Sequence, residues 1–237
     1  MIPARVWSAS VWVFFRFEGN IGDRFTAENI RRALLGPLPG YEAQVRMSPS
    51  HRAFTPPPGK GAPLIGAVML LLYPGEDEDA LFVVLTVRTE NVAHHKGQIS
   101  FPGGAAEPED ASLAHTAVRE ACEELGVCGD DVSVIGKLTP IYIEPSNFHV
   151  HPFVAYMPYR PSFEAQQEEV LRVLEVPVCH FFDPKNISAE NRVIDGTERH
   201  IPYFDVQGRK VWGATAIILS EFIAVLEKIG GLPDMRP

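Results

Sequence analysis

Apolar residues in the middle of the chain fall into runs that predict a sheet. Residues 64–73 and 80–88 are continuous apolar runs, separated by an acidic loop that contains Pro and Gly. Runs of this length around a turn signal are typical of paired strands buried on both faces. Residues 132–143 and 148–157 flank a second turn signal, and they predict two further strands.

Other segments carry the spacing of helices. Residues 111–125 contain no Pro or Gly, Asp110 stands at the expected N-cap, and Gly126 is a common helix end. Residues 25–35 and 167–176 show a similar pattern. We therefore expect three helices here, and an irregular arm rich in Pro and Gly between the first helix and the first strand.

The predicted helix over residues 111–125 carries three carboxylates, Glu120, Glu123 and Glu124, opposite its apolar arc. Their spacing brings like charges within reach of one another, where each pair is repulsive. Arg119 can pair with Glu123 but cannot neutralise all three. Mg²⁺ or Mn²⁺ could, because both prefer oxygen ligands. The alternative is an acidic face that is simply solvated.

The residues around this helix resemble the Nudix box, usually written G-x5-E-x7-R-E-U-x-E-E-x-G-U with U aliphatic. Gly104 is followed by five residues and then by Asp110 in place of Glu, and residues 119–127 read REACEELGV. Ala121 stands at an aliphatic place. Eight residues rather than seven separate Asp110 from Arg119.

This longer spacer is similar to that of the coenzyme A pyrophosphatase branch of the family. Residues 101–104 read FPGG and residues 110–112 read DAS, as in that branch. The branch also has an upstream motif, which residues 85–89 (LTVRT) and Gly97 resemble.

Two positions depart from the branch pattern. Thr89 replaces Ser or Ala, and Ala93 stands where a second Arg is expected. Lys96, His94 or His95 could substitute for the missing cation. The departure at Ala93 keeps other Nudix substrates open, namely ADP-ribose, NADH or a nucleoside triphosphate.

The resemblance implies a role for each matching residue. Glu120, Glu123, Glu124 and the carbonyl of Gly104 would hold Mg²⁺ or Mn²⁺. Arg119 would orient the carboxylates, and Glu123 and Glu169 are further catalytic candidates, Glu169 as the base. The candidate substrate-binding residues are Arg88, Lys96, Gly103 and Gly104.

Alternatives stand beside three of these interpretations. Arg88 ends a predicted strand, where its fork suits phosphate oxygens, but it could instead pair with Glu90 or with a box carboxylate. Glu169 could be an exposed residue favoured by a helix dipole. His149 and His151 share a strand face and could suggest a metal pair, but without a third ligand of suitable spacing we interpret them as ordinary strand residues.

Near the C-terminus, residues 192–201 and 203–211 predict a hairpin. Residues 212–216 (WGATA) resemble the start of the family's last helix, which we expect to end near residue 229. Trp212 is expected in the core.

The family fold implied is an α/β/α sandwich with a mixed sheet over residues 64–230. Residues 1–63 would add a strand, a helix and a Pro-rich arm packed on that domain. The implied activity is hydrolysis of coenzyme A or acyl-coenzyme A to 3′,5′-ADP and (acyl-)phosphopantetheine. A nucleotide sensor without catalysis is the rival of a different class, and a homodimer follows by family analogy.

Composition limits the other classes of function. A net charge of −9 disfavours broad contact with nucleic acid, which requires a basic surface. No apolar run approaches the roughly 18 residues of a membrane helix. The three cysteines form no CxxC pair, so we expect neither a zinc site nor a disulfide framework, and a cytoplasmic location.

The N-terminal residues 1–19 are apolar and could be mistaken for a targeting peptide. Arg16 interrupts the apolar run, and apolar residues alternate over residues 11–17. This alternation favours an added strand or an interface segment over a signal.

Overall fold

The computed structural model describes residues 24–75, 80–89, 97–194 and 196–229. The strand predicted within residues 1–19 lies outside these ranges.

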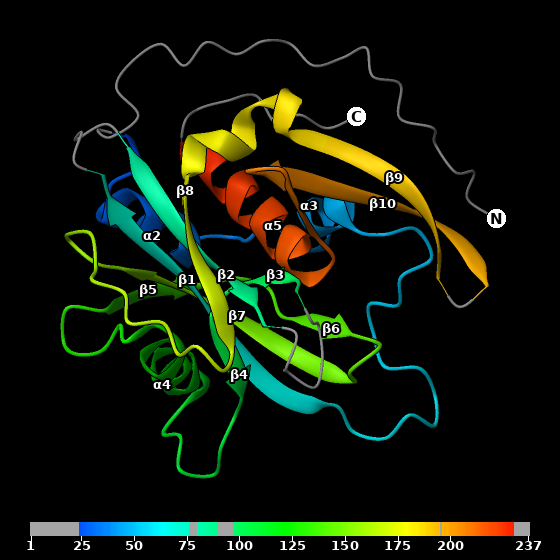
Figure 1. Ribbon diagram of the computed structural model, residues 1–237, viewed down its shortest axis with the longest axis horizontal. Helices are drawn as coiled ribbons and strands as arrows, with labels where there is room; N and C mark the ends of the chain where they lie inside the picture. Colours follow the sequence, from blue (N-terminus) through cyan, green and yellow to red (C-terminus); the bar gives the residue numbers. More distant parts are fainter. Residues whose placement is uncertain (1–23, 76–79, 90–96, 195, 230–237) are drawn as a thin grey trace.

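Within the described residues, the fold is built around an eight-stranded mixed sheet with β1 near its centre (Figure 1). β1 (Leu64–Pro74) pairs in parallel with β7 (Phe148–Tyr156) and antiparallel with β2 (Leu81–Arg88). The first two apolar runs are therefore adjacent strands, as predicted. The remaining strands of this sheet are β3 (Ile99–Ser100), β4 (Gly103–Ala105), β5 (Ser133–Lys137), β6 (Ile141–Ile143) and β8 (Val170–Pro177).

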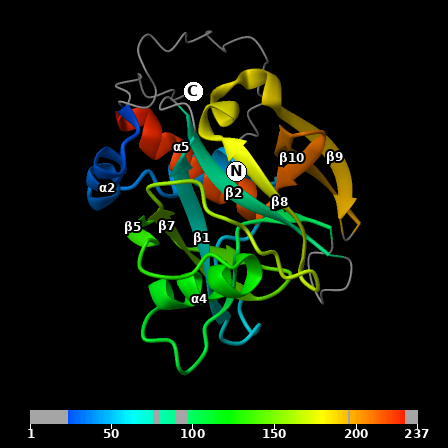
Figure 2. The same cartoon turned by 60° about the vertical axis from the view of Figure 1, so that its left-hand side comes forward.

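Helices cover both faces of this sheet, which gives the predicted α/β sandwich. In Figures 1 and 2, α4 (Leu113–Leu125) and α5 (Ala214–Ile229) lie on opposite sides of β1. A second, antiparallel sheet packs against α5. Its strands are β9 (Ile187–Ile194), β10 (Thr197–Val206) and β11 (Arg209–Trp212). The other helical segments are α2 (Ala27–Leu35), α3 (Tyr41–Gln44) and the 3₁₀ turns Val45–Met47, Val178–Phe182 and Pro184–Asn186.

Side chains of β1 alternate between two cores, as the period of a strand requires. Leu70 and Leu72 pack in the core that contains α5, whereas Met69 and Leu71 pack in the core that contains α4. The residues of α4 that enter this second core include Ala117 and Ala121. Their small side chains let the helix lie close to the sheet, which brings its carboxylates down to the strand ends.

The segment before β1 is tied to the sheet and to α5. α2 begins as predicted, because the hydroxyl of Thr26 accepts a hydrogen bond from the Asn29 backbone N–H. Glu221 on α5 is fully buried. It accepts hydrogen bonds from the Gly40 N–H (3.0 Å), Gln44 Nε2 (2.9 Å) and the Thr139 hydroxyl (2.6 Å).

The helix predicted over residues 167–176 is wrong. Residues from Val170 onward form β8, which pairs with β2 over most of its length. Val170 and Leu174 are buried at a spacing that fits a helix face or a strand face, whereas Val176, also buried, shares a face with them only in a strand. Pairing with β2 decides between the two.

Other boundaries also moved. Residues 132–143 form two short strands, β5 and β6, with Thr139-Pro140 between them. The predicted C-terminal hairpin with a turn near Pro202 is instead three strands joined by turns at Gly196 and Gly208, both at positive φ. Pro202 therefore lies inside β10 rather than between strands. Trp212 is half-buried rather than in the core, and the Arg192 guanidinium lies 5.2 Å from its ring centre.

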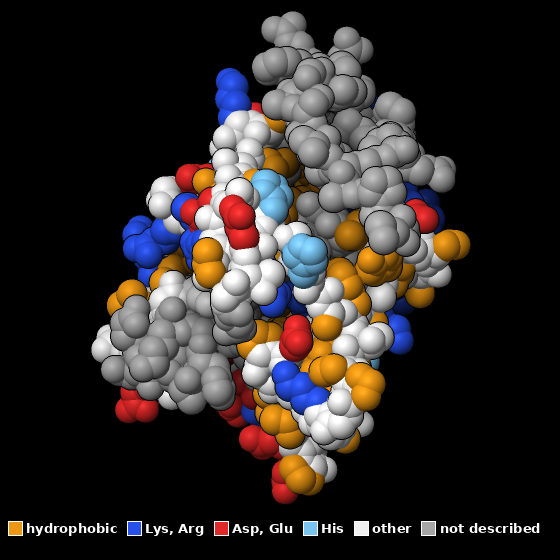
Figure 3. Space-filling view, turned by 90° about the vertical axis from the view of Figure 1, so that its right-hand side faces the viewer, with side chains coloured by type: hydrophobic (Ala, Val, Ile, Leu, Met, Phe, Trp, Pro, Cys, Tyr) orange, Lys and Arg blue, Asp and Glu red, His pale blue; other side chains and the backbone are white. Residues whose placement is uncertain are grey.

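The face in Figure 3 shows Lys and Arg side chains in separate groups among acidic and apolar ones.

Candidate active site

The helix α4 begins at Leu113, and its N-cap is Ser112, whose hydroxyl accepts a hydrogen bond from the His115 N–H. The prediction of Asp110 as the cap is wrong. Its carboxylate instead accepts hydrogen bonds from Arg119 Nε and Nη2, each at 3.1 Å, and from the Thr116 hydroxyl at 2.9 Å. The bond to Arg119 is the main reason why the pKa of Asp110 lies far below its usual value.

Arg119 connects Asp110 to the carboxylates of the helix. Its Nη1 donates to Glu120 Oε1 at 3.0 Å and to Glu123 Oε2 at 3.1 Å. Its Nη2 also donates to the carbonyl of Ala105 at 3.0 Å, at the end of β4. The pKa of Arg119 is raised, first by the bond to Asp110. The predicted pairing with Glu123 is therefore one contact of a larger cluster.

Two glycines let β4 lie against both β1 and α4. Gly103 and Gly104 belong to a short strand that pairs with β1 at Val68 and Ala67. A Cβ on Gly104 would come within 2.6 Å of the Glu120 carboxylate. Gly103 has a φ of +151°, and a Cβ there would meet the β1 backbone. Only glycine fits at these positions without a shift of the neighbouring groups.

Glu124 lies beneath this glycine strand and is only 3% exposed, so α4 does not carry all its acidic residues on a solvated face. Arg88 ends β2 as predicted, and its Nη1 lies 3.7 Å from Glu124 Oε1. Desolvation raises the pKa of Glu124 to about 8, although Arg88 opposes the shift. Desolvation also raises the pKa of Glu120.

Glu169 lies on the turn before β8, close enough to affect both of these carboxylates. Its negative charge adds to the rise in the pKa of Glu120 and of Glu124. Glu169 is half-buried and does not begin a helix. The structure thus brings Arg88, Glu169 and the box carboxylates to one end of the main sheet.

The sequence profile of the NUDIX domain matches residues 63–201, more than half of the chain. The chain belongs to the Nudix family.

Its curated relatives include the uncharacterized Nudix hydrolase NudL of Yersinia pestis (strain Pestoides F) and that of Yersinia pseudotuberculosis (serotype O:1b). Each is 34% identical over 137 residues, which cover 58% of this chain and 68% of the relative. A solved Nudix hydrolase from Alicyclobacillus acidocaldarius has a TM-score of 0.50 at 15% identity, and the match covers 75% of this chain and all of that one. This structural likeness shows the shared Nudix fold. The protein is thus a Nudix hydrolase.

Nudix hydrolases generally use divalent metal ions, and the carboxylates of this Nudix protein fit such an ion. Both side-chain oxygens of Glu124 are buried, and neither makes a well-formed hydrogen bond in the described part of the chain, although the nearby N–H of Gly103 opposes the rise in the Glu124 pKa. A buried carboxylate without well-formed hydrogen bonds is unfavourable unless a proton or a cation compensates it, and Arg88 at 3.7 Å does so only in part. Across the described residues, no three Asp, Glu, His or Cys side chains form a complete metal-binding group.

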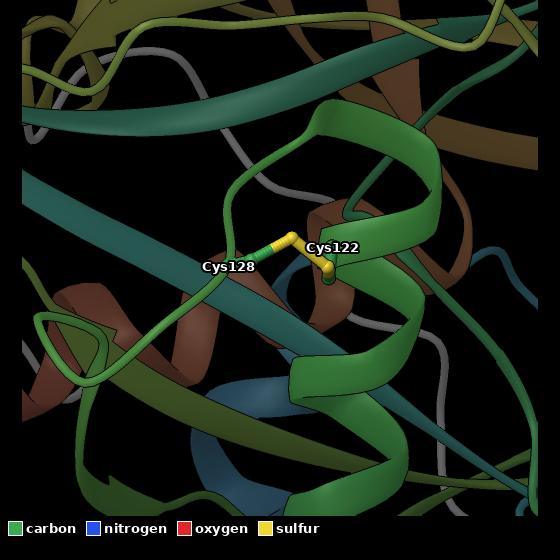
Figure 4. Close-up of a disulfide and its surroundings, with 2 residues drawn as sticks. All are labelled: Cys122 and Cys128. Carbon is green, nitrogen blue, oxygen red and sulfur yellow. A yellow bond between two sulfur atoms is a disulfide. The ribbon is translucent and has the colours of Figure 1, made fainter.

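The expectation of no disulfide is wrong. Cys122 lies in α4, which carries the three glutamates of the Nudix box and is called the Nudix helix from here on. It is bonded to Cys128, just beyond the helix end (Figure 4). The two Cα atoms are 4.7 Å apart, because Gly126 in a left-handed conformation turns the chain back toward the helix. A spacing of six residues gives no recognisable motif, so the sequence signal was weak.

Several predicted residues of the Nudix site are not part of it as described. Lys96, together with Glu90, Ala93, His94 and His95, lies outside the described residues. His149 and His151 lie side by side on β7, with ring centres 5.0 Å apart. Among the described residues, they belong to no group of three Asp, Glu, His or Cys side chains that could hold a metal ion.

Sequence reasoning missed the contacts of Thr89 with the turn that carries Glu169. In the sequence, Thr89 stands out only as a departure from Ser or Ala. Its hydroxyl offers the same hydrogen bond as Ser, which was the available signal.

Among the described helices, none is long and apolar enough to cross a membrane.

Proposed function

We propose that the protein hydrolyses the pyrophosphate bond of coenzyme A or acyl-coenzyme A, releasing 3′,5′-ADP and phosphopantetheine or its acyl form. The supporting motifs are FPGG at residues 101–104, DAS at residues 110–112 and LTVRT at residues 85–89. The observation that carries the proposal is the buried carboxylate of Glu124, which lies 3.7 Å from Arg88 and makes no well-formed hydrogen bond among the described residues. This arrangement provides one charge for a cation and an opposite charge for a phosphate.

In this proposal Glu120, Glu123, Glu124 and the carbonyl of Gly104 hold Mg²⁺ or Mn²⁺. When bound, the ion supplies positive charge that offsets the negative charge developing on the phosphate oxygens. Arg119 keeps Glu120 and Glu123 oriented through its ion pairs.

Other residues of the chain would act on the substrate and on water. Arg88, with Lys96 and the backbone of Gly103 and Gly104, would bind the phosphates. Glu169 would accept a proton from the attacking water. As the water oxygen bonds to phosphorus, the bridging oxygen of the pyrophosphate leaves with its electron pair.

A second substrate class is favoured by a specific observation. Ala93 replaces the second Arg of the coenzyme A motif, so one cation for the coenzyme's phosphates is missing at that place. ADP-ribose, NADH or a nucleoside triphosphate would then be the substrate of the same site. The complete set of three glutamates disfavours a sensor that only binds a nucleotide.

The experiment is a product assay with coenzyme A, acetyl-coenzyme A, ADP-ribose and NADH, each in Mg²⁺ and in Mn²⁺, with products identified by mass. Formation of 3′,5′-ADP from coenzyme A as the fastest reaction supports the proposal. Faster cleavage of ADP-ribose or NADH would overturn the proposal that coenzyme A is the substrate. No product from any of them, nor from nucleoside triphosphates, favours the sensor.

Glu123→Gln gives a separate test of the metal site. Glu123 is 58% exposed at its side chain, so the variant should fold normally. We expect its turnover to be nearly abolished at an unchanged melting temperature. Unchanged turnover would remove Glu123 from the metal site.

We also propose that residues 1–63 are an arm packed on a Nudix domain of residues 64–230, that the protein forms a homodimer, and that it is cytoplasmic, a location in which the Cys122–Cys128 bond would have to persist against reduction. The arm is supported by Ile30 and Leu34 of α2, which are buried in the core that contains α5.

A further inference from the structure

The turn that carries Glu169 is fixed at its beginning to the end of the Nudix helix. The N–H of Glu164 donates to the carbonyl of Leu125 at 2.8 Å, and the N–H of Gln166 donates to the carbonyl of Glu124 at 2.9 Å. The last carbonyls of a helix have no partner within the helix, so they are available for such bonds. The start of the turn is therefore positioned by the last residues of the helix that carries the carboxylates.

The far end of the turn is fixed by Thr89. The N–H of Thr89 donates to the carbonyl of Glu169 at 2.9 Å, and its hydroxyl donates to the carbonyl of Glu168 at 2.7 Å. Thr89 is 6% exposed and directly follows Arg88, which lies beside Glu124. Both bonds hold the backbone immediately around Glu169.

Internal bonds close the turn between these two anchors. The N–H groups of Glu169 and Val170 both donate to the carbonyl of Gln166, at 3.1 and 2.9 Å. The position of Glu169 is thus determined by the helix on one side and by the end of β2 on the other. The charge of Glu169 contributes to the raised pKa of both Glu120 and Glu124, so this placement lies near both carboxylates.

We propose that Thr89 is a positioning residue that holds the Glu169 turn against the carboxylates of the Nudix helix. The inference rests on the proposed function, in which Glu169 accepts the proton of the attacking water. The N–H bond to Glu169 is available to any residue but proline. The hydroxyl bond to Glu168 requires Ser or Thr, so the side chain can be tested separately from the backbone.

The decisive experiment compares Thr89→Val, Thr89→Ser and Glu169→Gln with the double variant Thr89→Val/Glu169→Gln. Val has nearly the shape of Thr but cannot donate to Glu168. A misplacement of the order of 1 Å lowers turnover by about 10-fold to 100-fold, so we expect that loss in kcat for Thr89→Val, with little change in KM. Thr89→Ser should recover most of the rate.

The double variant separates positioning from general destabilisation. If Thr89 acts through Glu169, Thr89→Val causes no further loss once Glu169 is Gln. A further loss equal to that in the wild-type background overturns the proposal, as does an unchanged rate for Thr89→Val. Thr197→Val, an exposed threonine on β10, is the matched control and should keep full activity and melting temperature.

A measurement without turnover keeps this inference distinct from the proposed function. Mn²⁺ affinity is titrated for the same variants, because a carboxylate held near the site strengthens cation binding. We expect Thr89→Val to weaken Mn²⁺ binding about threefold to tenfold in the wild-type background and not in Glu169→Gln. Equal Mn²⁺ affinity for Thr89→Val and wild type would overturn the inference. An enzyme that cleaves no substrate but shows the affinity pattern overturns only the proposed function.

Discussion

Replacing Glu124 by Gln should make the metal-free protein more stable at alkaline pH. The unfolded chain exposes Glu124 with a pKa near 4.5, whereas burial raises the pKa in the folded protein to about 8. At 1.36 kcal/mol per pH unit, ionisation of the buried group lowers the free energy of unfolding by up to about 5 kcal/mol. Gln keeps the shape of the side chain and cannot ionise.

The sign of the pH dependence follows from proton binding. Between pH 4.5 and about 8 the folded protein retains a proton at Glu124 that the unfolded chain has already lost. Stability therefore decreases as pH rises through this window, and the full loss is present above the folded pKa. The wild-type protein should lose several kcal/mol more than Glu124→Gln between pH 5 and pH 9.

The assay is urea unfolding in a chelator at several pH values, followed by the same series in Mn²⁺. In the metal, the wild type should regain stability, by about 2.7 kcal/mol at a hundredfold excess over Kd, and Glu124→Gln should regain much less. Glu123→Gln, with its exposed side chain, is the control that should keep the wild-type pH dependence. Parallel stability curves for the wild type and Glu124→Gln would refute the reasoning about desolvation.

Two further predictions concern the Nudix helix and its neighbours. Cys122→Ser or reduction should lower the free energy of unfolding by about 2 kcal/mol, because Cys122–Cys128 closes a loop of about seven residues. The urea midpoint with and without a reductant measures this, and unchanged midpoints would contradict it. Gly104→Ala should lower turnover at least about tenfold, because its Cβ would displace the Glu120 carboxylate. Gly36→Ala is the matched control, since its Cβ would meet only one backbone oxygen at 3.4 Å, and kinetics equal to that control would exclude a close approach at Gly104.

The central layers of the fold could be predicted because they depend on local pattern. The apolar runs of β1 and β2 have no helical period, and the run without Pro or Gly before Gly126 fits α4. The end of α4 was placed correctly, since Gly126 adopts the left-handed conformation that a glycine cap provides. Its start was placed too early because Asp110 is also a suitable cap residue. A contact with Arg119, nine residues away, determines its actual role.

The identity of the acidic residues was readable from the sequence, but their environments were not. Helical spacing places Glu120, Glu123 and Glu124 near one another and predicts a shared face. It does not reveal that Glu124 is buried beneath β4 while Glu123 stays exposed. That difference depends on Gly103 and Gly104, which pair with β1 and close over one side of the helix.

Local spacing also gave the wrong helix over residues 167–176, and the position of Glu169 within that segment makes this error matter for the mechanism. On a helix start, this carboxylate would point along the dipole toward solvent, and nothing would hold it near the Nudix box. In the structure, the chain enters β8 at this point because β8 pairs with the edge of β2. Thr89, which directly follows β2, donates hydrogen bonds to the Glu168 and Glu169 carbonyls. Strand pairing over a distance of some 80 residues therefore decides whether a catalytic role for Glu169 is geometrically available, and a local reading of the sequence has no access to it.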